Sequence, residues 1–268
     1  MKDTLILIIS LEAHFLITIN ILMAISTMHS PHLLSTHMLR KMVNLLARLF
    51  LFSLSLHCFV SSLTADTKNI TTDQYALIAF KSLITLDPYN TLANSWSTSS
   101  SVCSWVGVTC DERHNRVHSL NLTNMGLRGT VSPNLGNLSF LVIVDLKNNS
   151  FGGQLPTELC SLYRLKVLDF SYNEFVGGIP NALEDLSQLQ YLYLGANNFS
   201  GFLPQSIGNL HRLKVLNICN NKLSGLIPQT ISNMSSLEYL GLPSNYFSGT
   251  LTSNKTCHVC LFPTIFHF

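Results

Sequence analysis

Side chains that could carry out catalysis are scattered through this 268-residue sequence and form no known catalytic pattern. It contains neither a G-x-S-x-G nucleophile motif nor cysteines and histidines at metal-ligand spacing. The marks of a protein kinase, which are a glycine-rich loop, H-R-D and D-F-G, are also missing. We therefore expect no enzyme activity, no cofactor and no metal, and the remaining chemistry is recognition.

Aspartates and tyrosines at outward-facing positions of repeated short strands are the candidates for binding a partner. They are Asp145, Asp169, Tyr172, Tyr191, Tyr193 and Tyr239. Neighbouring strands lie ~4.8 Å apart, so Asp145 and Asp169 would stand side by side, a like-charge arrangement that costs stability. Aromatic residues beside charges are common in binding hot spots. The hypothesis is a strip that binds a peptide or protein, and the alternative is a solvated face without a ligand.

Seven cysteines are the other reactive groups, and their spacing alone does not establish a disulfide. They are Cys58, Cys103, Cys110, Cys160, Cys219, Cys257 and Cys260. Zinc at Cys103 and Cys110 is disfavoured, because no second Cys or His pair lies nearby at ligand spacing. The C-x-x-C pair at the end is weak as a redox or zinc motif.

A period of 24 residues organises the chain from Val117 to Leu251. Six units begin at Val117, Leu141, Leu165, Leu189, Leu213 and Leu237, the last being incomplete, and positions are numbered from 0 at these residues. Positions 3 and 5 are apolar and alternate with polar or variable residues, as in a strand with one buried face. Positions 10, 14, 18 and 21 of the complete units are apolar too. A single unit cannot bury them all, whereas stacked units cover one another.

Asparagine recurs at position 8, as Asn149, Asn173, Asn197, Asn221 and Asn245, with Met125 in the first unit. An inward asparagine can donate and accept, so a stack of them is expected to satisfy backbone groups of the turn that leaves each strand. Glycine at position 12 fits a bend with little room for a side chain. Proline at position 15 of four units has no backbone N–H to donate to a neighbouring strand, and it stiffens the back of each coil.

These positions match the leucine-rich repeat pattern L-x-x-L-x-L-x-x-N-x-L, and the added F/L-x-G-x-I/L-P resembles its plant extracellular subclass. The resemblance implies an α/β-type solenoid with a short parallel β-sheet on its concave face. The expected organisation is a leader at residues 1–65, a cap at 66–116, six repeats at 117–251 and an aberrant tail at 252–268.

The expected cap begins with a helix, because residues 72–84 carry apolar side chains at helical spacing, and Thr72 or Asp73 can serve as its N-cap. With the later C-x-W-x-G-V-x-C it resembles the N-terminal cap of plant leucine-rich repeat receptor kinases and receptor-like proteins. The matching residues are Asp73, Ala76, Leu77, Phe80, Lys81, Asp87, Pro88, Trp96, Cys103, Trp105, Gly107, Val108 and Cys110. The resemblance implies a disulfide between Cys103 and Cys110. V-S-P-N-L-G-N-L-S-F-L then resembles the receptor-kinase subfamily that includes plant receptors for bacterial molecules.

Secretion is expected from a signal-peptide-like segment at about 42–65, where basic residues precede the apolar run 49–60. Residues 5–26 are also largely apolar and are either a membrane anchor or translated upstream sequence without a role. Membrane association is expected through these N-terminal segments only. The expected location is therefore secreted, extracellular or at the plasma membrane.

Seven N-x-S/T motifs become candidate glycosylation sites in a secreted chain: Asn69, Asn121, Asn137, Asn148, Asn198, Asn233 and Asn254. Asn137 and Asn233 share position 20, on the expected convex side, whereas a glycan on Asn121 would obstruct the first coil. The net charge of +2 and the charged fraction of 11% give no nucleic-acid signature.

The leading hypothesis for function is an extracellular recognition module, resembling a truncated receptor-kinase ectodomain in plant defence signalling. Its implied partners are a peptide or protein ligand and a co-receptor kinase, with no nucleic acid. The alternatives are a secreted inhibitor of a pathogen wall-degrading enzyme, which an inhibition assay would distinguish, and a nonfunctional gene fragment.

Overall fold

The computed structural model describes residues 69–249 and 258–259, and all of them belong to one compact unit, residues 68–268. The expected leader, its signal-like segment and most of the expected tail lie outside the described residues. Within the described ranges, no helix is long and apolar enough to cross a membrane.

The cap comprises two α-helices, α3 (Ile70–Lys81) and α4 (Thr91–Ser95), the 3-10 helix η1 (Val102–Ser104) and the strands β1 (Ile84–Leu86) and β2 (Val108–Cys110). The expected start of the first helix is wrong. Asn69 is the N-cap, and its Oδ1 accepts hydrogen bonds from the backbone N–H groups of Thr71 and Thr72. The Thr72 hydroxyl in turn accepts from the Asn69 N–H, which completes a capping box.

Asp73 is not a cap but one half of a buried ion pair that joins the cap to the first repeat. Its side chain is fully buried and receives Arg116 Nε at 2.8 Å and Nη2 at 2.7 Å. The backbone N–H of Val117 also donates to Asp73, at 2.9 Å. Three donors compensate the buried carboxylate, so this pair fixes the helix against the first strand.

Aromatic stacking and a disulfide close the cap, and the disulfide confirms the pairing that the resemblance implied. Cys103 and Cys110 are bonded, with their Cα atoms 5.4 Å apart. Trp96 and Trp105 stack with ring centroids 5.3 Å apart. Phe80 of α3 lies 5.7 Å from Phe151, so the aromatic core of the cap continues into the repeats.

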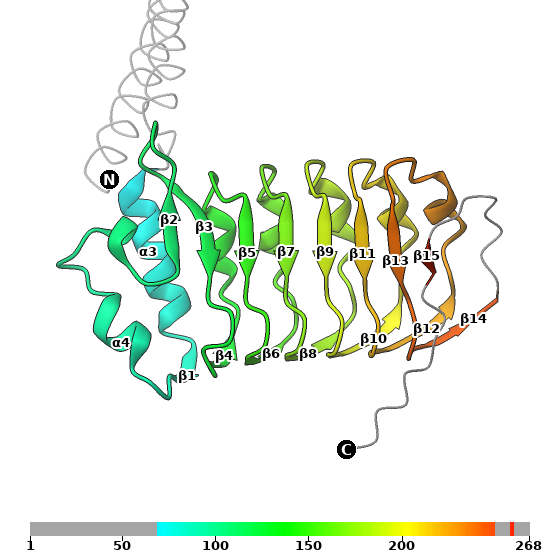
Figure 1. Cartoon of the computed structure of the whole chain (residues 1–268), viewed down its shortest axis with the longest axis horizontal. Coiled ribbons are helices and arrows are strands. Elements are labelled where there is room, and N and C mark those ends of the chain that lie inside the picture. The colour runs from blue at the N-terminus through cyan, green and yellow to red at the C-terminus, as the bar shows by residue number, and fades with distance from the viewer. Residues whose placement is uncertain (1–68, 250–257, 260–268) are drawn as a thin grey trace, which may run out of the picture. The chain divides into compact units, whose positions relative to one another are not determined.

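The main sheet contains one parallel strand from each of the six units, which confirms the expected architecture (Figure 1). These strands are β3 (Val117–Asn121), β5 (Ile143–Asp145), β7 (Val167–Asp169), β9 (Tyr191–Tyr193), β11 (Val215–Asn217) and β13 (Tyr239–Gly241). β2 is antiparallel to β3 at one edge. At the other edge β15 (His258–Val259) pairs with β13, so the tail supplies a strand that its departure from the repeat pattern did not predict.

A second sheet, which the repeat pattern did not predict, runs along another side of the coils. Its parallel strands are β4 (Arg128–Thr130), β6 (Ser150–Gly153), β8 (Glu174–Gly177), β10 (Asn198–Phe202), β12 (Lys222–Leu226) and β14 (Tyr246–Ser248), with β1 antiparallel to β4. The 3-10 helices η2 (Pro133–Asn137), η3 (Thr157–Ser161), η4 (Asn181–Asp185), η5 (Gln205–Asn209) and η6 (Gln229–Asn233) complete the coils. The helical part of each of the first five repeats is thus a five-residue 3-10 helix.

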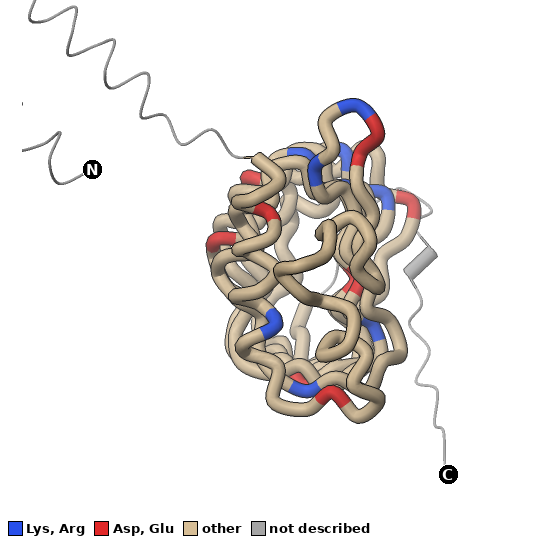
Figure 2. Tube along the Cα trace, turned by 90° about the vertical axis from the view of Figure 1, so that its left-hand side faces the viewer, with Lys and Arg blue, Asp and Glu red and all other residues tan. Residues whose placement is uncertain are grey.

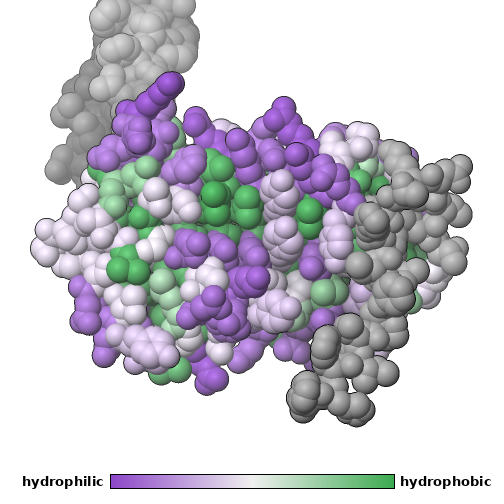
Figure 3. All heavy atoms as spheres, viewed as in Figure 1, coloured by the Kyte–Doolittle hydropathy of each residue, from purple (hydrophilic) through white to green (hydrophobic). Residues whose placement is uncertain are grey.

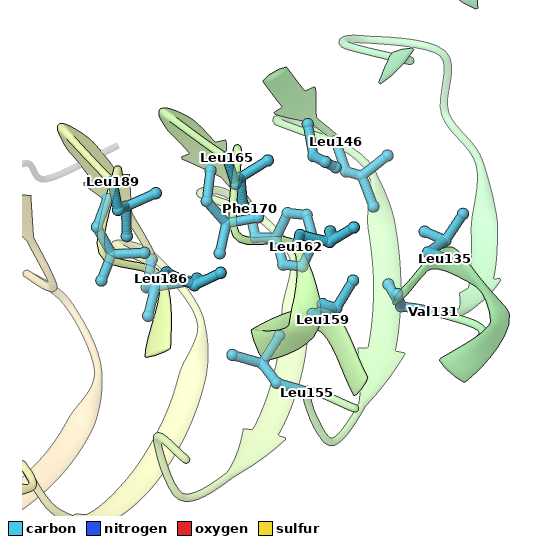
Figure 4. Packing of buried hydrophobic residues seen from close by; sticks show 14 of the residues in the cluster. Val131, Leu135, Leu146, Leu155, Leu159, Leu162, Leu165, Phe170, Leu186 and Leu189 are labelled. Atoms are coloured by element: carbon cyan, nitrogen blue, oxygen red, sulfur yellow. The ribbon is translucent and has the colours of Figure 1, made fainter. Parts of the chain in front are cut away.

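The core is a set of apolar rows that run through consecutive coils. Leu165 and Leu189, at position 0, are fully buried, as are Leu146 and Phe170 at position 5. Figure 4 shows these side chains directed into the interior, toward leucines such as Leu162 on the helical side. Each coil therefore covers the apolar face of the next one.

The position-8 asparagines lie inside the turns that leave the main sheet. Asn173 Oδ1 accepts from the Phe151 N–H at 2.9 Å, across to the preceding coil. Its Nδ2 donates to Leu146 O at 3.0 Å and to Phe170 O at 3.2 Å, so one amide joins two coils. Asn149, Asn197, Asn221 and Asn245 make corresponding bonds.

The position-12 glycines have a positive φ, which only glycine adopts readily, and all but Gly249 lie within strands of the second sheet rather than in the expected bends. A side chain from the preceding coil also occupies the space beside most of them. A Cβ on Gly225 would overlap the ring of Phe202, and one on Gly153 would come within 3.2 Å of Thr130 Cγ2.

Candidate recognition face

The main sheet presents two rows of outward side chains, one on each side of the buried position-3 leucines and valine. The position-4 row runs in register through Asn121, Asp145, Asp169, Tyr193 and Asn217. The position-2 row contains Ile143, Val167, Tyr191, Val215 and Tyr239. In Figure 3 hydrophobic atoms form a patch near the middle of this face, with hydrophilic atoms above and below it. The face is therefore amphipathic.

Asp145 and Asp169 are neighbours in the register, and both carboxylates also hold the turn that follows their strand. Asp145 Oδ1 accepts from the Lys147 N–H at 3.0 Å, and Asp169 Oδ1 accepts from the Ser171 N–H at 2.9 Å. Asn121 and Asn217 make the same bond at position 4 of their own repeats. Asp or Asn at position 4 thus also forms an Asx turn, a structural role that the strand pattern did not predict.

Electrostatics at the centre of the row disfavour charge on both groups of the Asp169–Tyr193 pair. Burial is the main cause that raises the pKa of Asp169 above its ordinary value, and the neighbouring Asp145 carboxylate adds to it. Hydrogen bonds from Ser171 oppose that rise. Burial also raises the pKa of Tyr193, with Asp169 and Tyr191 as the further causes. Tyr193 is therefore a neutral phenol at physiological pH, able to donate to a ligand.

The tyrosines of the position-2 row lie on the same face. Tyr191 is half-buried beside Val167 and Val215, and Tyr239 is two strands further along. Gly241 makes room for Tyr239, because a Cβ there would come within 3.0 Å of the tyrosine Cε1.

Tyr172 lies beyond the strand rather than on it, so its expected position on the strand face is wrong. The main-sheet strand β7 ends at position 4, and position 7 is a turn residue with φ +56°. The side chain is 58% exposed, and Lys147 Nζ lies 5.9 Å from the ring centroid. Asparagine suits this left-handed conformation better than tyrosine does, so Tyr172 carries a conformational cost at an exposed edge of the face.

The glycosylation motifs differ in their surroundings. Asn137, Asn148 and Asn233 are exposed, and Asn121 is exposed at the edge of the position-4 row. Asn69 caps α3 through Oδ1, and Asn198 lies half-buried in β10. Asn254 lies outside the described residues. Occupancy of these motifs stays a prediction.

Other reactive groups of the described residues form no catalytic or metal-binding constellation. No cluster of three or more His, Cys, Asp or Glu residues that could hold a metal occurs in this part of the chain. Cys160 is buried, and that burial raises the pKa of its thiol to about 11. A thiol of this kind is inert at neutral pH.

A stack of short parallel strands that presents one amphipathic face and is closed by a disulfide-bonded cap defines a repeat protein built for binding. The chain belongs to the leucine-rich repeat family: a model described as a leucine-rich repeat region matches residues 116–252. A second model, a leucine-rich repeat N-terminal domain, matches residues 70–111.

The relatives of this chain include plant receptor kinases. It is 48% identical over 81 residues to the LRR receptor-like serine/threonine-protein kinase EFR of Arabidopsis thaliana, covering 30% of this chain and 8% of that protein. It is 42% identical over 90 residues to the receptor kinase-like protein Xa21 of Oryza sativa subsp. japonica, covering 31% and 9%. The aligned part thus spans less than a tenth of either relative.

Solved structures extend the likeness to receptor ectodomains. The BIR2 ectodomain from Arabidopsis thaliana matches with a TM-score of 0.61 and 35% identity, covering 68% of this chain and 97% of that one. The Arabidopsis receptor kinase HAESA, solved with the peptide hormone IDA and the co-receptor SERK1, matches with a TM-score of 0.61 and 36% identity, covering 66% and 30%.

Proposed function

We propose that this chain is an extracellular recognition module that binds a peptide or protein ligand on its main sheet, in plant defence signalling. The observation that carries the proposal is the register that sets Asp145, Asp169 and Tyr193 in one row, with Tyr191 on the same strand as Tyr193. Carboxylates supply charge and acceptors, and the tyrosines supply apolar area with a hydroxyl donor. Tyr172 and Tyr239 extend the surface at its edges.

The comparisons support the same kind of ligand. HAESA was solved in complex with a peptide hormone and a co-receptor. EFR and Xa21 are receptor-like kinases. By analogy we propose a peptide ligand, a co-receptor kinase as the second partner, and a location outside the cell or at the plasma membrane. In this proposal the described repeats contribute binding.

A selection from random peptides tests this proposal and requires no candidate ligand. The wild-type chain is immobilised and screened against a displayed random-peptide library, and the selected peptides are synthesised. Truncating one hot-spot aromatic costs at least about 2 kcal/mol, and such losses do not simply add, so Tyr191→Ala/Tyr193→Ala is expected to weaken peptide binding by at least about thirtyfold.

Tyr246→Ala is the matched control, because Tyr246 is 68% exposed but belongs to the second sheet. It should leave the affinity unchanged. Peptides that bind the main-sheet variant as tightly as the wild type, or a library that yields no binder, would count against the proposal.

A further inference from the structure

One short segment recurs after two repeats instead of after each repeat. R-L-K-V-L occurs at residues 164–168 and again, 48 residues later, at 212–216, whereas the unit between them has Q-L-Q-Y-L at 188–192. The leucines are buried and required by the stack. The basic residues before and after the first leucine are not, since glutamine serves in the intervening coil. The two pairs of basic residues, here called doublets, are therefore not explained by the needs of folding.

The four cations Arg164, Lys166, Arg212 and Lys214, here called the cationic rim, lie just before the starts of β7 and β11. These strands are separated by β9, so the doublets are roughly 9.6 Å apart at ~4.8 Å per strand. The strands point downward in Figure 1, and Figure 2 shows several Lys and Arg segments at the upper end, with Asp and Glu segments among them. Arg164, Lys166 and Arg212 are exposed, and Lys214 is half-buried.

Neighbouring groups hold the rim arginines in place without neutralising them. Arg164 Cζ lies 4.2 Å from the centroid of the Phe140 ring, and its Nε donates to the Tyr163 hydroxyl at 3.2 Å. Arg212 Nη1 donates to Gln188 Oε1 at 2.6 Å. Among residues 69–249 the ion pairs join His114 to Asp111, Arg116 to Asp73 and Arg128 to Glu174, and none includes a rim cation.

An acidic residue adjoins the rim at Lys214, whose backbone oxygen accepts from the Glu238 N–H at 2.8 Å. Glu238 follows Lys214 at position 1 of the next unit and marks the end of the basic run. Towards the cap, the equivalent residues Phe140 and Val142 are uncharged, and Arg116 is already paired. The rim is thus a line of two positive doublets with the amides of Gln188 and Gln190 between them.

From this pattern we infer that the cationic rim binds a linear polyuronate, a polysaccharide whose sugar units carry carboxylates at regular intervals. Arginine and lysine pair with carboxylates, and glutamine amides can bond sugar hydroxyls between them. An acidic peptide fits less well, since peptide hot spots need buried apolar anchors. Of the large apolar side chains exposed in the described part of the chain, only Tyr163 adjoins the rim. This site does not include the aspartates and tyrosines proposed to bind a peptide, and it does not depend on them.

The test uses an oligogalacturonate of defined length, captured on a sensor, with the full chain in solution. Wild type is expected to bind, and binding should weaken as salt is raised, because exposed charges are screened. Arg164→Gln/Lys166→Gln converts R-L-K to the Q-L-Q already present at residues 188–190, so it should fold normally. With half of the rim charge removed, affinity should fall by roughly tenfold.

The matched control, Arg128→Gln/Lys222→Gln, removes two exposed cations from the second sheet and should bind as wild type does. The fully methyl-esterified oligomer, which keeps the sugars but lacks the charges, should not bind. Three results would overturn the inference: no binding by wild type, equal loss in the control variant, or binding of poly-glutamate of the same length as tight as that of the oligogalacturonate. The last would assign the rim to an acidic peptide.

Discussion

At the scale of single residues, the amide of Asn197 shows how one side chain serves two coils. Its Oδ1 accepts from the Phe175 N–H at 3.0 Å, and its Nδ2 donates to Phe170 O at 2.9 Å and Leu194 O at 3.1 Å. Each of these backbone groups is remote from water. A buried group that loses its partner costs more than the bond itself contributes.

Asn197→Ala is therefore expected to lower the free energy of unfolding by about 2–3 kcal/mol, because it removes the acceptor of a buried N–H and opens a polar gap. Urea unfolding followed by circular dichroism measures it. Asn181→Ala, at an exposed position in η4, is the control and should change stability little. Equal stability of the two variants would show that the position-8 amides do not hold the coils.

Asp169 makes the stability of the folded chain depend on pH. Its pKa is raised in the folded chain above the ordinary 3.8, chiefly by burial. The folded state then binds the proton more tightly than the unfolded state, so stability decreases as pH rises from below 3.8 through the raised pKa. Asp169→Asn removes this penalty while keeping an acceptor for the Ser171 N–H, as Asn121 and Asn217 do at the same position.

Asp169→Asn should therefore be more stable than wild type at pH 7, with the difference shrinking as pH falls through the raised pKa of Asp169 and lost below the ordinary value of 3.8. Asp111→Asn should behave oppositely, because hydrogen bonds from His114 lower the pKa of Asp111 and make its ionised form stabilising above the ordinary pKa. Unfolding curves recorded from acid to neutral pH decide both. A neutral-pH loss of stability in Asp169→Asn would refute the role assigned to burial.

At the scale of elements, the main-sheet strands and the disulfide could be predicted, but the second sheet could not. Leu168 and Phe170 alternate with outward residues, and this alternation by itself predicts a strand with one buried face. The second-sheet segment at residues 174–177, Glu-Phe-Val-Gly, contains one buried side chain and a glycine, which alone favours a turn. It becomes a strand because the neighbouring coils supply hydrogen-bond partners, which no single repeat contains.

The candidate site was predictable to the same extent. Register followed from the period, so the neighbours Asp145 and Asp169 could be placed. Tyr172 could not, because the left-handed turn at position 7 depends on where the strand ends. Likewise, the partner of Asp73 is 43 residues away, and nothing in the local pattern of the helix identifies it.

The buried ion pair that joins the cap to the repeats can be tested separately. Asp73→Leu and Arg116→Leu should each cost about 3–5 kcal/mol, because each leaves a buried charge unpaired. The double variant should cost much less than the sum, since no charge is then left in the interior. Chemical unfolding of all four proteins gives the coupling. Additive losses would mean that the two side chains act independently.

At the scale of the whole molecule, some residues of the described coils stabilise the fold, and others remain accessible for the proposed binding. Buried leucines and phenylalanines together with the position-8 asparagines build the stack, while Tyr191 and Tyr193 remain accessible on the main sheet. The cationic rim lies just before β7 and β11, and Tyr191 and Tyr193 lie on β9 between those strands, so two ligands of different chemistry could be bound side by side.

The most direct test of the account asks where a selected peptide touches the chain. A photo-reactive side chain is placed on the main sheet by Tyr193→benzoylphenylalanine, or on the second sheet by Tyr246→benzoylphenylalanine, and each protein is irradiated with the peptide. The account predicts cross-linking at residue 193 and none at residue 246. Cross-linking at residue 246 with none at residue 193 would contradict it.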